Sequence, residues 1–219
     1  MSCVIVIMRV EVIPPPPQYA IESREINGVK IWSIGTLHEY KGEPCKTLYD
    51  KLVEHGQLQS QDQLLTILRG LRGNFACIMQ DHEGRLFAAV DKIRSYPMFY
   101  AQAGDILYVG SDPYAIKTRL PQTTKNQDAF LEFKMAGYVT GGDTLFNEIK
   151  QLQAGEFLVW NGRDLMVQDY YTFYNPESSK KSRDELIDEL HQTTRRIFKK
   201  TVERLNGRPA WVSLSGGLD

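Results

Sequence analysis

Short apolar segments joined by tight turns fill the middle of the chain. Three pairs of these segments predict β-hairpins, over residues 74–91, 97–111 and 155–171. The last pair turns at Asn161-Gly162, a dipeptide that readily adopts the left-handed backbone of a two-residue hairpin turn. Such hairpins must bury their apolar faces against another layer. The chain is therefore predicted to form stacked antiparallel sheets with helices outside, an α+β fold.

The N-terminal part extends this pattern with further strands and with helices. We predict a first strand over residues 2–10, "SCVIVIMRV", and the prolines at 14–17 prevent its continuation because proline cannot donate to a β-ladder. Another hairpin is predicted over residues 19–37, with its turn at Asn27-Gly28. Apolar side chains at helical spacing predict helices over residues 48–56, 61–71 and 126–137, the last capped by Asn126 and ended by Gly137.

The composition argues against several classes of protein. Lys and Arg number 26 against 27 Asp and Glu, so no basic surface for nucleic acid is implied. The apolar N-terminus lacks a basic n-region and is broken by prolines, which argues against a signal peptide and against a membrane span. We therefore expect a soluble, cytoplasmic protein that binds neither nucleic acid nor membrane.

The cysteines and histidines indicate neither a disulfide framework nor a zinc site. Cys3, Cys45 and Cys77 are odd in number and have no CxxC spacing, which favours reduced thiols in a cytosol. The four histidines are scattered along the chain, without the spacing of metal ligands.

A polar stretch, "YNPESSKKS" at residues 174–182, separates two parts of different character. Behind it, Ser182 and Glu185 have the spacing of a capping box that opens a helix. A helix followed by a strand is the start of an α/β domain. We therefore predict a first domain, a linker and the beginning of a second domain, over residues 1–175, 176–182 and 183–219.

The second part closes with an apolar segment and a glycine turn, "AWVSLSGGLD". Residues 210–214 are predicted to form a buried strand, followed by a turn at Ser215-Gly216-Gly217. Glycines let backbone N–H groups face phosphate oxygens, and a serine hydroxyl adds another donor. On the first turn of a following helix, Asp219 would be placed to hold Mg²⁺ between phosphates. The same tripeptide also occurs in plain turns, so residue chemistry alone leaves both a nucleotide site and a structural turn open.

Four stretches, in the same order, resemble the asparagine synthetase family: "LRGNFACIMQDHEGRLFAAVDKIRSYPMFYA", "ILYVGSDPYAI", "GYVTGGDTLFNEIKQLQAGEFLVW" and "VSLSGGLD". The last is similar to the pyrophosphate loop of that family's ATP-pyrophosphatase domain. The resemblance implies a class II glutamine amidotransferase domain with an Ntn-hydrolase-like four-layer α/β/β/α sandwich. The first helix and strand of an α/β nucleotide-binding domain would follow. Members are usually more than twice this length, so the chain is expected to be truncated.

The same resemblance implies that the glutaminase chemistry is degenerate. The family's nucleophile is an N-terminal cysteine whose free α-amine activates the thiol. Here Cys3 follows Met1-Ser2 and is interpreted as a buried small hydrophobe, which leaves Ser2 as the nucleophile candidate. The family segments that hold glutamine and form the oxyanion hole have no match. Asp62 is a candidate for binding the glutamine amine, with a plain surface carboxylate as the competing interpretation.

Asp91 and Pro97 match positions of the family and are interpreted as structural, one as a strand-end carboxylate and the other as part of a rigid turn. The family's arginine before that aspartate is Val90 here, and its glycine is replaced at Arg94-Ser95. This stretch therefore keeps the order of the family's motif but departs from it at individual positions.

By resemblance, we expect an ATP-dependent amide-forming ligase. MgATP would adenylate a small-molecule or peptide carboxylate with release of pyrophosphate, and ammonia or an amine would then attack. ATP and Mg²⁺ are the implied cofactors, and a homodimer is the assembly that the family suggests. The residues implied to hold ATP and its pyrophosphate are Leu214, Ser215, Gly216, Gly217 and Asp219, the last also as a Mg²⁺ ligand.

Two alternatives stay open. One is an enzyme similar to β-lactam synthetases or lasso-peptide cyclases, which would close a ring on an amine within the substrate. The other is a non-catalytic pseudo-glutaminase that serves as a binding module. In each case, the 219-residue chain alone is expected to release no pyrophosphate from ATP.

Overall fold

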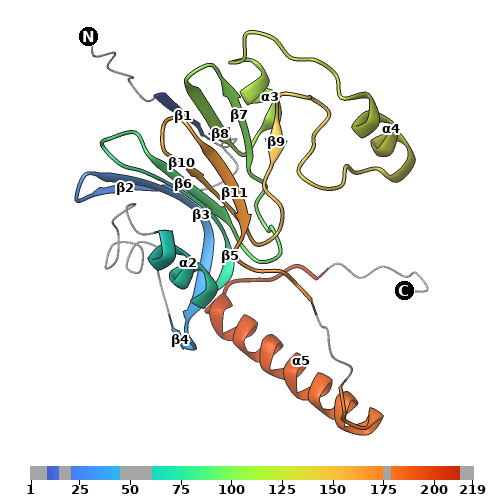
Figure 1. Cartoon of the computed structure of the whole chain (residues 1–219). Helices are drawn as coiled ribbons and strands as arrows, with labels where there is room; N and C mark the ends of the chain where they lie inside the picture. Colours follow the sequence, from blue (N-terminus) through green and yellow to red (C-terminus); the bar gives the residue numbers. More distant parts are fainter. Residues whose placement is uncertain (1–8, 15–20, 45–60, 175–178, 213–219) are drawn as a thin grey trace. The chain divides into compact units, whose positions relative to one another are not determined.

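The computed structural model describes residues 9–14, 21–44, 61–174 and 179–212 (Figure 1). The chain divides into two units, Met1–Phe173 and Tyr174–Asp219, and each is described by itself. The predicted helix over residues 48–56 lies outside the described ranges, as does most of the predicted first strand. No helix within these ranges is long and apolar enough to cross a membrane.

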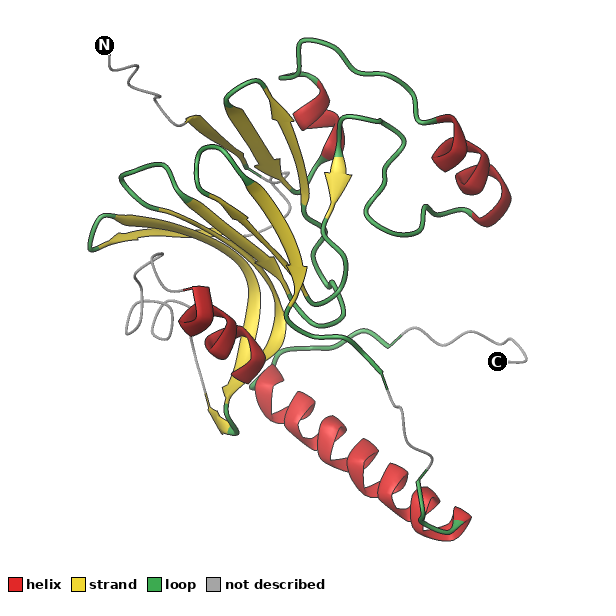
Figure 2. Ribbon diagram, viewed as in Figure 1, coloured by secondary structure: helices red, strands yellow, loops and turns green. Residues whose placement is uncertain are grey.

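Two β-sheets form the centre of the described part of the first unit (Figure 2). The larger sheet has seven strands in the order β11-β10-β6-β5-β3-β2, with β4 paired to β3. They are β2 (Ile21–Ile26), β3 (Val29–Tyr40), β4 (Glu43–Pro44), β5 (Leu71–Gln80), β6 (Leu86–Val90), β10 (Glu156–Trp160) and β11 (Leu165–Asp169). The smaller sheet has the order β1-β8-β7-β9, with β1 (Arg9–Ile13), β7 (Phe99–Ala103), β8 (Ile106–Gly110) and β9 (Lys150–Gln151).

The hairpins predicted from the sequence are present. β2 and β3 meet at Asn27-Gly28, whose φ angles of 52° and 77° lie in the left-handed region. The pairs β5–β6, β7–β8 and β10–β11 are antiparallel, as predicted. β3 and β5 are both longer than predicted because they pair with each other from Lys30–Gln80 to Tyr40–Leu71. That long-range pairing extends each strand beyond its own hairpin.

One pairing differs from the predicted antiparallel arrangement. β1 runs parallel to β8, with Arg9 opposite Ile106 and Ile13 opposite Gly110. Parallel neighbours need a long crossover connection, and these two strands are far apart in the sequence. Hairpin turns carry no signal for such a pairing, so the local pattern could not reveal it.

Three apolar clusters show that the first unit is built in four layers. Helix α2 (Gln61–Gly70) covers the outer face of the larger sheet through Leu64, Ile67 and Leu68. A second cluster lies between the two sheets. A third joins the smaller sheet to helix α3 (Pro113–Lys117) through Ile116. This order of helix, sheet, sheet and helix confirms the predicted sandwich (Figure 2).

β5 shows how the sequence encodes these layers. Phe75, Cys77 and Met79 belong to the cluster under α2, whereas Ala76 and Ile78 belong to the cluster between the sheets. Successive side chains of a strand point to opposite faces, and both faces of β5 are covered. Its sequence is therefore the unbroken apolar run "FACIM", without an alternation of polar and apolar residues.

Helix α4 (Gln127–Ala136) begins and ends where the sequence predicts. Asn126 Oδ1 accepts a hydrogen bond from Ala129 N at 3.1 Å, which caps the first turn. Gly137 follows the helix at a φ of 80°, the left-handed conformation that glycine adopts without strain.

The second unit contains helix α5 (Arg183–Leu205). Its predicted capping box is confirmed, because Glu185 N donates to Ser182 Oγ and Ser182 N donates to the Glu185 carboxylate at 2.7 Å. The helix ends at Asn206, which has a left-handed φ of 47°. None of the described side chains of α5 is buried.

The predicted strand over residues 210–214 is wrong in its described part. Ala210, Trp211 and Val212 have no strand conformation, and the side chains of Trp211 and Val212 are 99% and 83% exposed. A strand is stable when its backbone pairs with a neighbour and its apolar face is covered. The described residues provide no such neighbour for this segment, and residues 213–219 lie outside the described ranges.

Candidate functional site

Most residues that the sequence predicts as site residues lie outside the described ranges, namely Ser2, Leu214, Ser215, Gly216, Gly217 and Asp219. Asp62 is described and is exposed in the first turn of α2, where its carbonyl oxygen accepts a hydrogen bond from Thr66 Oγ1. It lines neither of the two cavities described below. The role of Asp62 in glutamine binding therefore stays a prediction.

Asp91 lies directly after β6 and is buried, with 1% of its surface exposed. Its Oδ2 accepts hydrogen bonds from Phe75 N and Ser95 N at 2.9 and 3.0 Å, and its Oδ1 accepts one from Ile93 N at 2.9 Å. These backbone donors replace the water that a buried carboxylate loses. Asp91 thereby fixes the turn between β6 and β7, in agreement with its predicted structural role.

Two more hydrogen bonds hold the start of this turn. Tyr170 Oη donates to Val90 O at 2.8 Å, and Gly155 N donates to Asp91 O at 3.0 Å. Burial raises the pKa of the Tyr170 phenol, so its hydroxyl remains a donor. The strands β6, β10 and β11 are thus tied together at one end of the larger sheet.

The residues that follow Asp91 border two cavities. Pro97 and Met98 line a cavity between the two sheets, and Arg94 lines another near α3 and α4. A single fixed turn therefore presents side chains to both.

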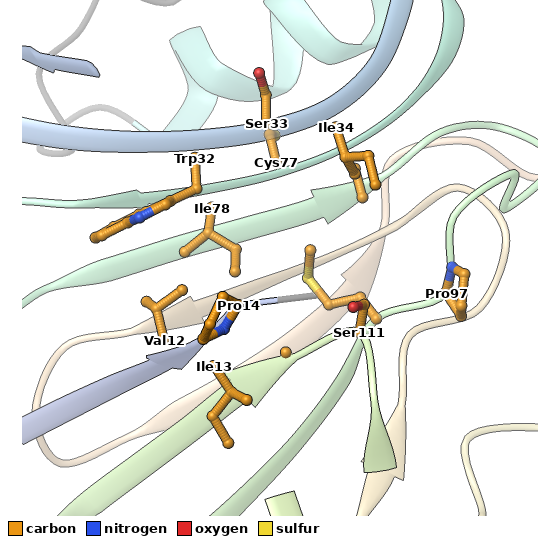
Figure 3. Close-up of a pocket in the computed structure, with 13 residues that line it drawn as sticks. Val12, Ile13, Pro14, Trp32, Ser33, Ile34, Cys77, Ile78, Pro97 and Ser111 are labelled. Atoms are coloured by element: carbon orange, nitrogen blue, oxygen red, sulfur yellow. The ribbon is translucent and has the colours of Figure 1, made fainter. Parts of the chain in front are cut away.

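The cavity between the sheets has a volume of about 230 Å³ and mainly apolar walls. Figure 3 shows Ile34 and Ile78 of the larger sheet facing Val12 and Pro14 of the β1 segment across it. Ser33 points to the opposite side of its strand. The alternation along β1 is visible in the same view, because Ile13 points away from Val12 and Pro14.

Ser111 and Cys77 are the lining residues whose hydroxyl and thiol groups bear on the chemistry of this cavity. Ser111 Oγ is buried and has no hydrogen-bond partner among the described residues. The Cys77 side chain belongs to the cluster under α2, and burial raises its pKa to about 12, so the thiol is not a nucleophile at neutral pH. The described lining contains no charged side chain. The cavity therefore suits an apolar or neutral molecule better than a zwitterion.

The second cavity has a volume of about 250 Å³ and combines a guanidinium with aromatic rings. Arg94 Nη2 donates to Gln151 Oε1 at 2.5 Å, and Arg94 Nε is buried without a partner in the described chain. Gln151 Nε2 donates to the carbonyl oxygens of Gly141 and Asp143 at 3.0 and 2.9 Å. Burial lowers the pKa of Arg94, and the charge of Glu156 acts in the opposite direction. The rings are those of Phe99, Tyr114, Phe133, Tyr138 and Phe146.

Reasoning from the sequence did not identify Arg94, Gln151 or Ser111 as site residues. The sequence did contain a signal for Arg94: the asparagine synthetase family has a glycine in this stretch, and here that glycine is replaced at Arg94-Ser95. Gln151 and Ser111 gave no local signal, since their neighbours come from distant parts of the chain. Only the packing of the sheets brings these groups to a cavity.

Comparison with known proteins identifies a domain family for the first unit. Residues 60–171 match the family model of the glutamine amidotransferase domain. Over 183 residues, 80% of this chain, the sequence is 26% identical to the glutamine-hydrolyzing asparagine synthetase 3 of Bacillus subtilis strain 168. The match spans 28% of that relative's length. These findings confirm the predicted likeness to asparagine synthetases.

Two solved structures are similar at a TM-score of 0.41. One is glutamine phosphoribosylpyrophosphate amidotransferase from B. subtilis complexed with ADP and GMP, at 17% identity over 71% of this chain and 32% of that one. The other is the allosteric regulatory enzyme of purine biosynthesis, at 16% identity over 69% of this chain and 30% of that one.

Proposed function

Because this chain belongs to the glutamine amidotransferase domain family, we propose that it is the amidotransferase-like part of an ATP-dependent, amide-forming ligase. MgATP adenylates a carboxylate of a small molecule or peptide with release of pyrophosphate, and ammonia or an amine then attacks the acyl-adenylate, forms the amide and displaces AMP. The amidotransferase-like domain itself does not hydrolyse glutamine and serves as a scaffold. The observation that carries the proposal is the match to a glutamine-hydrolyzing asparagine synthetase over 80% of the chain, which extends beyond the residues matched by the family model.

The chemistry of the interior supports a scaffold rather than a glutaminase. A bound glutamine needs partners for its α-amine and its α-carboxylate, and burying either charge without a partner is costly. The described lining of the cavity between the sheets has no charged side chain. Cys77, the cysteine within the described ranges, is buried and its raised pKa keeps the thiol protonated.

The sequence supports the same proposal at the N-terminus. An N-terminal nucleophile needs its own free α-amine as the general base. In the sequence Met1-Ser2-Cys3 the α-nitrogen of Cys3 is part of a peptide bond, and removal of Met1 alone would expose Ser2. Under this proposal neither residue hydrolyses glutamine.

ATP is proposed to bind at the glycine turn near residue 219. Ser215, Gly216 and Gly217 would hold the pyrophosphate group, the Leu214 backbone would lie against the adenosine, and Asp219 would bind Mg²⁺. The support for this site is the resemblance of "VSLSGGLD" to the pyrophosphate loop of asparagine synthetases. The expected reduced thiols suit a cytoplasmic enzyme.

Pyrophosphate release tests the proposed ligase. The full-length protein from its natural source is incubated with MgATP, candidate carboxylates and either ammonium or glutamine. We expect pyrophosphate and amide with ammonium and neither with glutamine. Asp219→Ala should lower the rate at least tenfold because it removes the proposed metal ligand, whereas Asp62→Ala should leave it unchanged. The 219-residue chain alone should release no pyrophosphate.

Other outcomes separate the alternatives. Amide formation with glutamine at the rate seen with ammonium would show a working glutaminase and contradict the scaffold. Pyrophosphate release without any added nitrogen source, with loss of water from the substrate, would identify a macrolactam-forming enzyme. No pyrophosphate from any carboxylate would favour the binding module and contradict the ligase.

A further inference from the structure

Arg94 has a backbone conformation that suits glycine. Its φ is 55°, in the left-handed region that residues with a side chain seldom adopt. The turn imposes this conformation, because Arg94 N donates to Asp91 O at 3.1 Å and Ser95 N donates to Asp91 Oδ2. Glycine would form the same turn without strain. A strained residue that is kept where glycine would fit indicates a use for its side chain.

The guanidinium of Arg94 is half-buried and forms no close ion pair, although the charge of Glu156 acts on it from a greater distance. Within the described ranges, no carboxylate oxygen lies within 4.0 Å of it, and its hydrogen bond goes to the neutral Gln151. Asp143 is paired with Lys150, and the Glu156 carboxylate accepts a hydrogen bond from Gln153 N at 2.6 Å. Burying a cation without an anion is costly, so an anion that entered this cavity would be stabilised.

Aromatic rings form much of the remaining cavity wall, which also includes Asp143, the partner of Lys150. The Phe99 ring centroid lies 5.9 Å from Arg94 Cζ, and the Tyr114 and Phe146 rings meet edge to face at 5.5 Å. Tyr114 and Tyr138 are 59% and 61% exposed, so their rings remain accessible at the cavity. Exposed aromatic side chains beside a cavity provide apolar contact area for a flat molecule.

We propose that this cavity is a binding site for a small carboxylate with a flat apolar body, such as an aryl carboxylate. The planar guanidinium of Arg94 would pair with the carboxylate, and the aromatic rings would contact the body of the ligand. Gln151 is a positioning residue, because it holds Arg94 on one side and the loop at Gly141 and Asp143 on the other. The site is independent of glutamine or ATP chemistry and does not rest on the proposed function.

Phenylacetate is a suitable first probe, because it joins one ring to one carboxylate. Titration calorimetry on the 219-residue chain should show one site. Phenylacetamide keeps the ring without the charge, and acetate keeps the charge without the ring. Each should bind at least tenfold more weakly than phenylacetate, because phenylacetamide lacks the carboxylate that pairs with Arg94 and acetate lacks the ring that contacts the aromatic wall.

Arg94→Gly provides the decisive variant, since glycine adopts the left-handed backbone and the protein should fold at least as stably as the wild type. Its affinity for phenylacetate should fall at least tenfold. Arg119→Ala is the matched control, because Arg119 is exposed, is paired with Glu11 and does not line this cavity. That variant should bind phenylacetate as the wild type does.

Three results would overturn the proposal. They are the absence of phenylacetate binding by the wild type, equal affinity in the wild type and Arg94→Gly, and a lower melting temperature for Arg94→Gly without ligand. The last would show that Arg94 stabilises the fold through its contact with Gln151 and is not kept for a ligand.

Discussion

Asp91 places a carboxylate in the protein interior, and backbone N–H groups of Phe75, Ile93 and Ser95 replace its lost water. In Asp91→Ala these donors, of which Phe75 N is buried and Ile93 N and Ser95 N are partly buried, lose their partner, and an unpaired buried donor costs about 1–3 kcal/mol. We predict that Asp91→Ala lowers the free energy of unfolding by at least about 3 kcal/mol in urea denaturation. Asp105→Ala, at an exposed site, should change it by less than about 0.5 kcal/mol. Equal stabilities of the two variants would contradict this role of Asp91.

Gly35 shows how closely the strands of the larger sheet approach one another. It has a φ of 105°, and a Cβ at this position would lie 2.0 Å from Asn74 O and 2.6 Å from Tyr96 Cε2. Since the nearest atom belongs to the backbone, β3 and β5 would have to separate. Gly35→Ala should therefore cost roughly 3 kcal/mol or more of unfolding free energy.

Gly104→Ala is the matched control for Gly35. Gly104 also has a positive φ, 61°, but nothing lies within 4 Å of a Cβ built there. Its substitution should cost only the backbone strain, about 1 kcal/mol. Thermal or urea unfolding of both variants checks the difference, and a cost at Gly104 equal to that at Gly35 would show that steric approach is unimportant.

Individual residues differ in how far the sequence reveals their role. The caps Asn126 and Ser182 and the turn Asn27-Gly28 were predictable, because their partners lie within a few residues. The environment of Arg94 was not predictable, because Gln151 and the aromatic rings come from other parts of the chain.

At the scale of elements, α5 depends on its capping box. Ser182→Ala removes the acceptor of Glu185 N, and the loss of an N-cap costs about 1 kcal/mol. We expect faster amide exchange in the first turn of α5, measured by NMR. Thr201→Ala is the control, because its hydroxyl bonds to Ile197 O inside the helix, and alanine should slow exchange or leave it unchanged. Equal exchange in the two variants would exclude a contribution from the cap.

The same cap predicts a pH dependence. Hydrogen bonds from the Ser182 backbone and side chain lower the pKa of Glu185 in the folded chain. A carboxyl with a lowered pKa stabilises the folded state above its ordinary pKa of about 4.3, and this contribution disappears as the pH falls through the lowered value. Protection of the backbone amides in the first turn of α5 against hydrogen exchange should therefore decrease below about pH 4.3. Glu185→Gln should remove that pH dependence. If Glu185→Gln shows the same pH dependence of amide protection as the wild type, the Glu185 carboxylate is not its cause.

Strands and helices with local signals were predictable, and those that depend on distant partners were not. The hairpins and the capped helices follow from turn residues and apolar spacing. The parallel pairing of β1 with β8 and the extra length of β3 come from long-range contacts. Residues 210–212 show that a local apolar pattern is not sufficient for a strand, because this segment has no partner strand in the described chain and stays exposed.

At the scale of the whole molecule, hairpins alone predicted stacked sheets, and the resemblance to asparagine synthetases added the order of the four layers. The three apolar clusters of the first unit show that order. Neither source predicted the two cavities, because they arise where the layers meet. The proposed nucleotide site was predicted from a short motif that lies outside the described residues.

The proposed scaffold role of this domain is most directly tested by measuring glutamate release from glutamine. Wild-type chain and Ser2→Ala are compared at equal concentration, with a reaction without protein as the background. We predict that both equal the background, because Cys3 follows Met1-Ser2 in the sequence and the described cavity between the sheets offers no charged group for glutamine. Glutamate release by the wild type that is lost in Ser2→Ala would show an active N-terminal serine and contradict the scaffold.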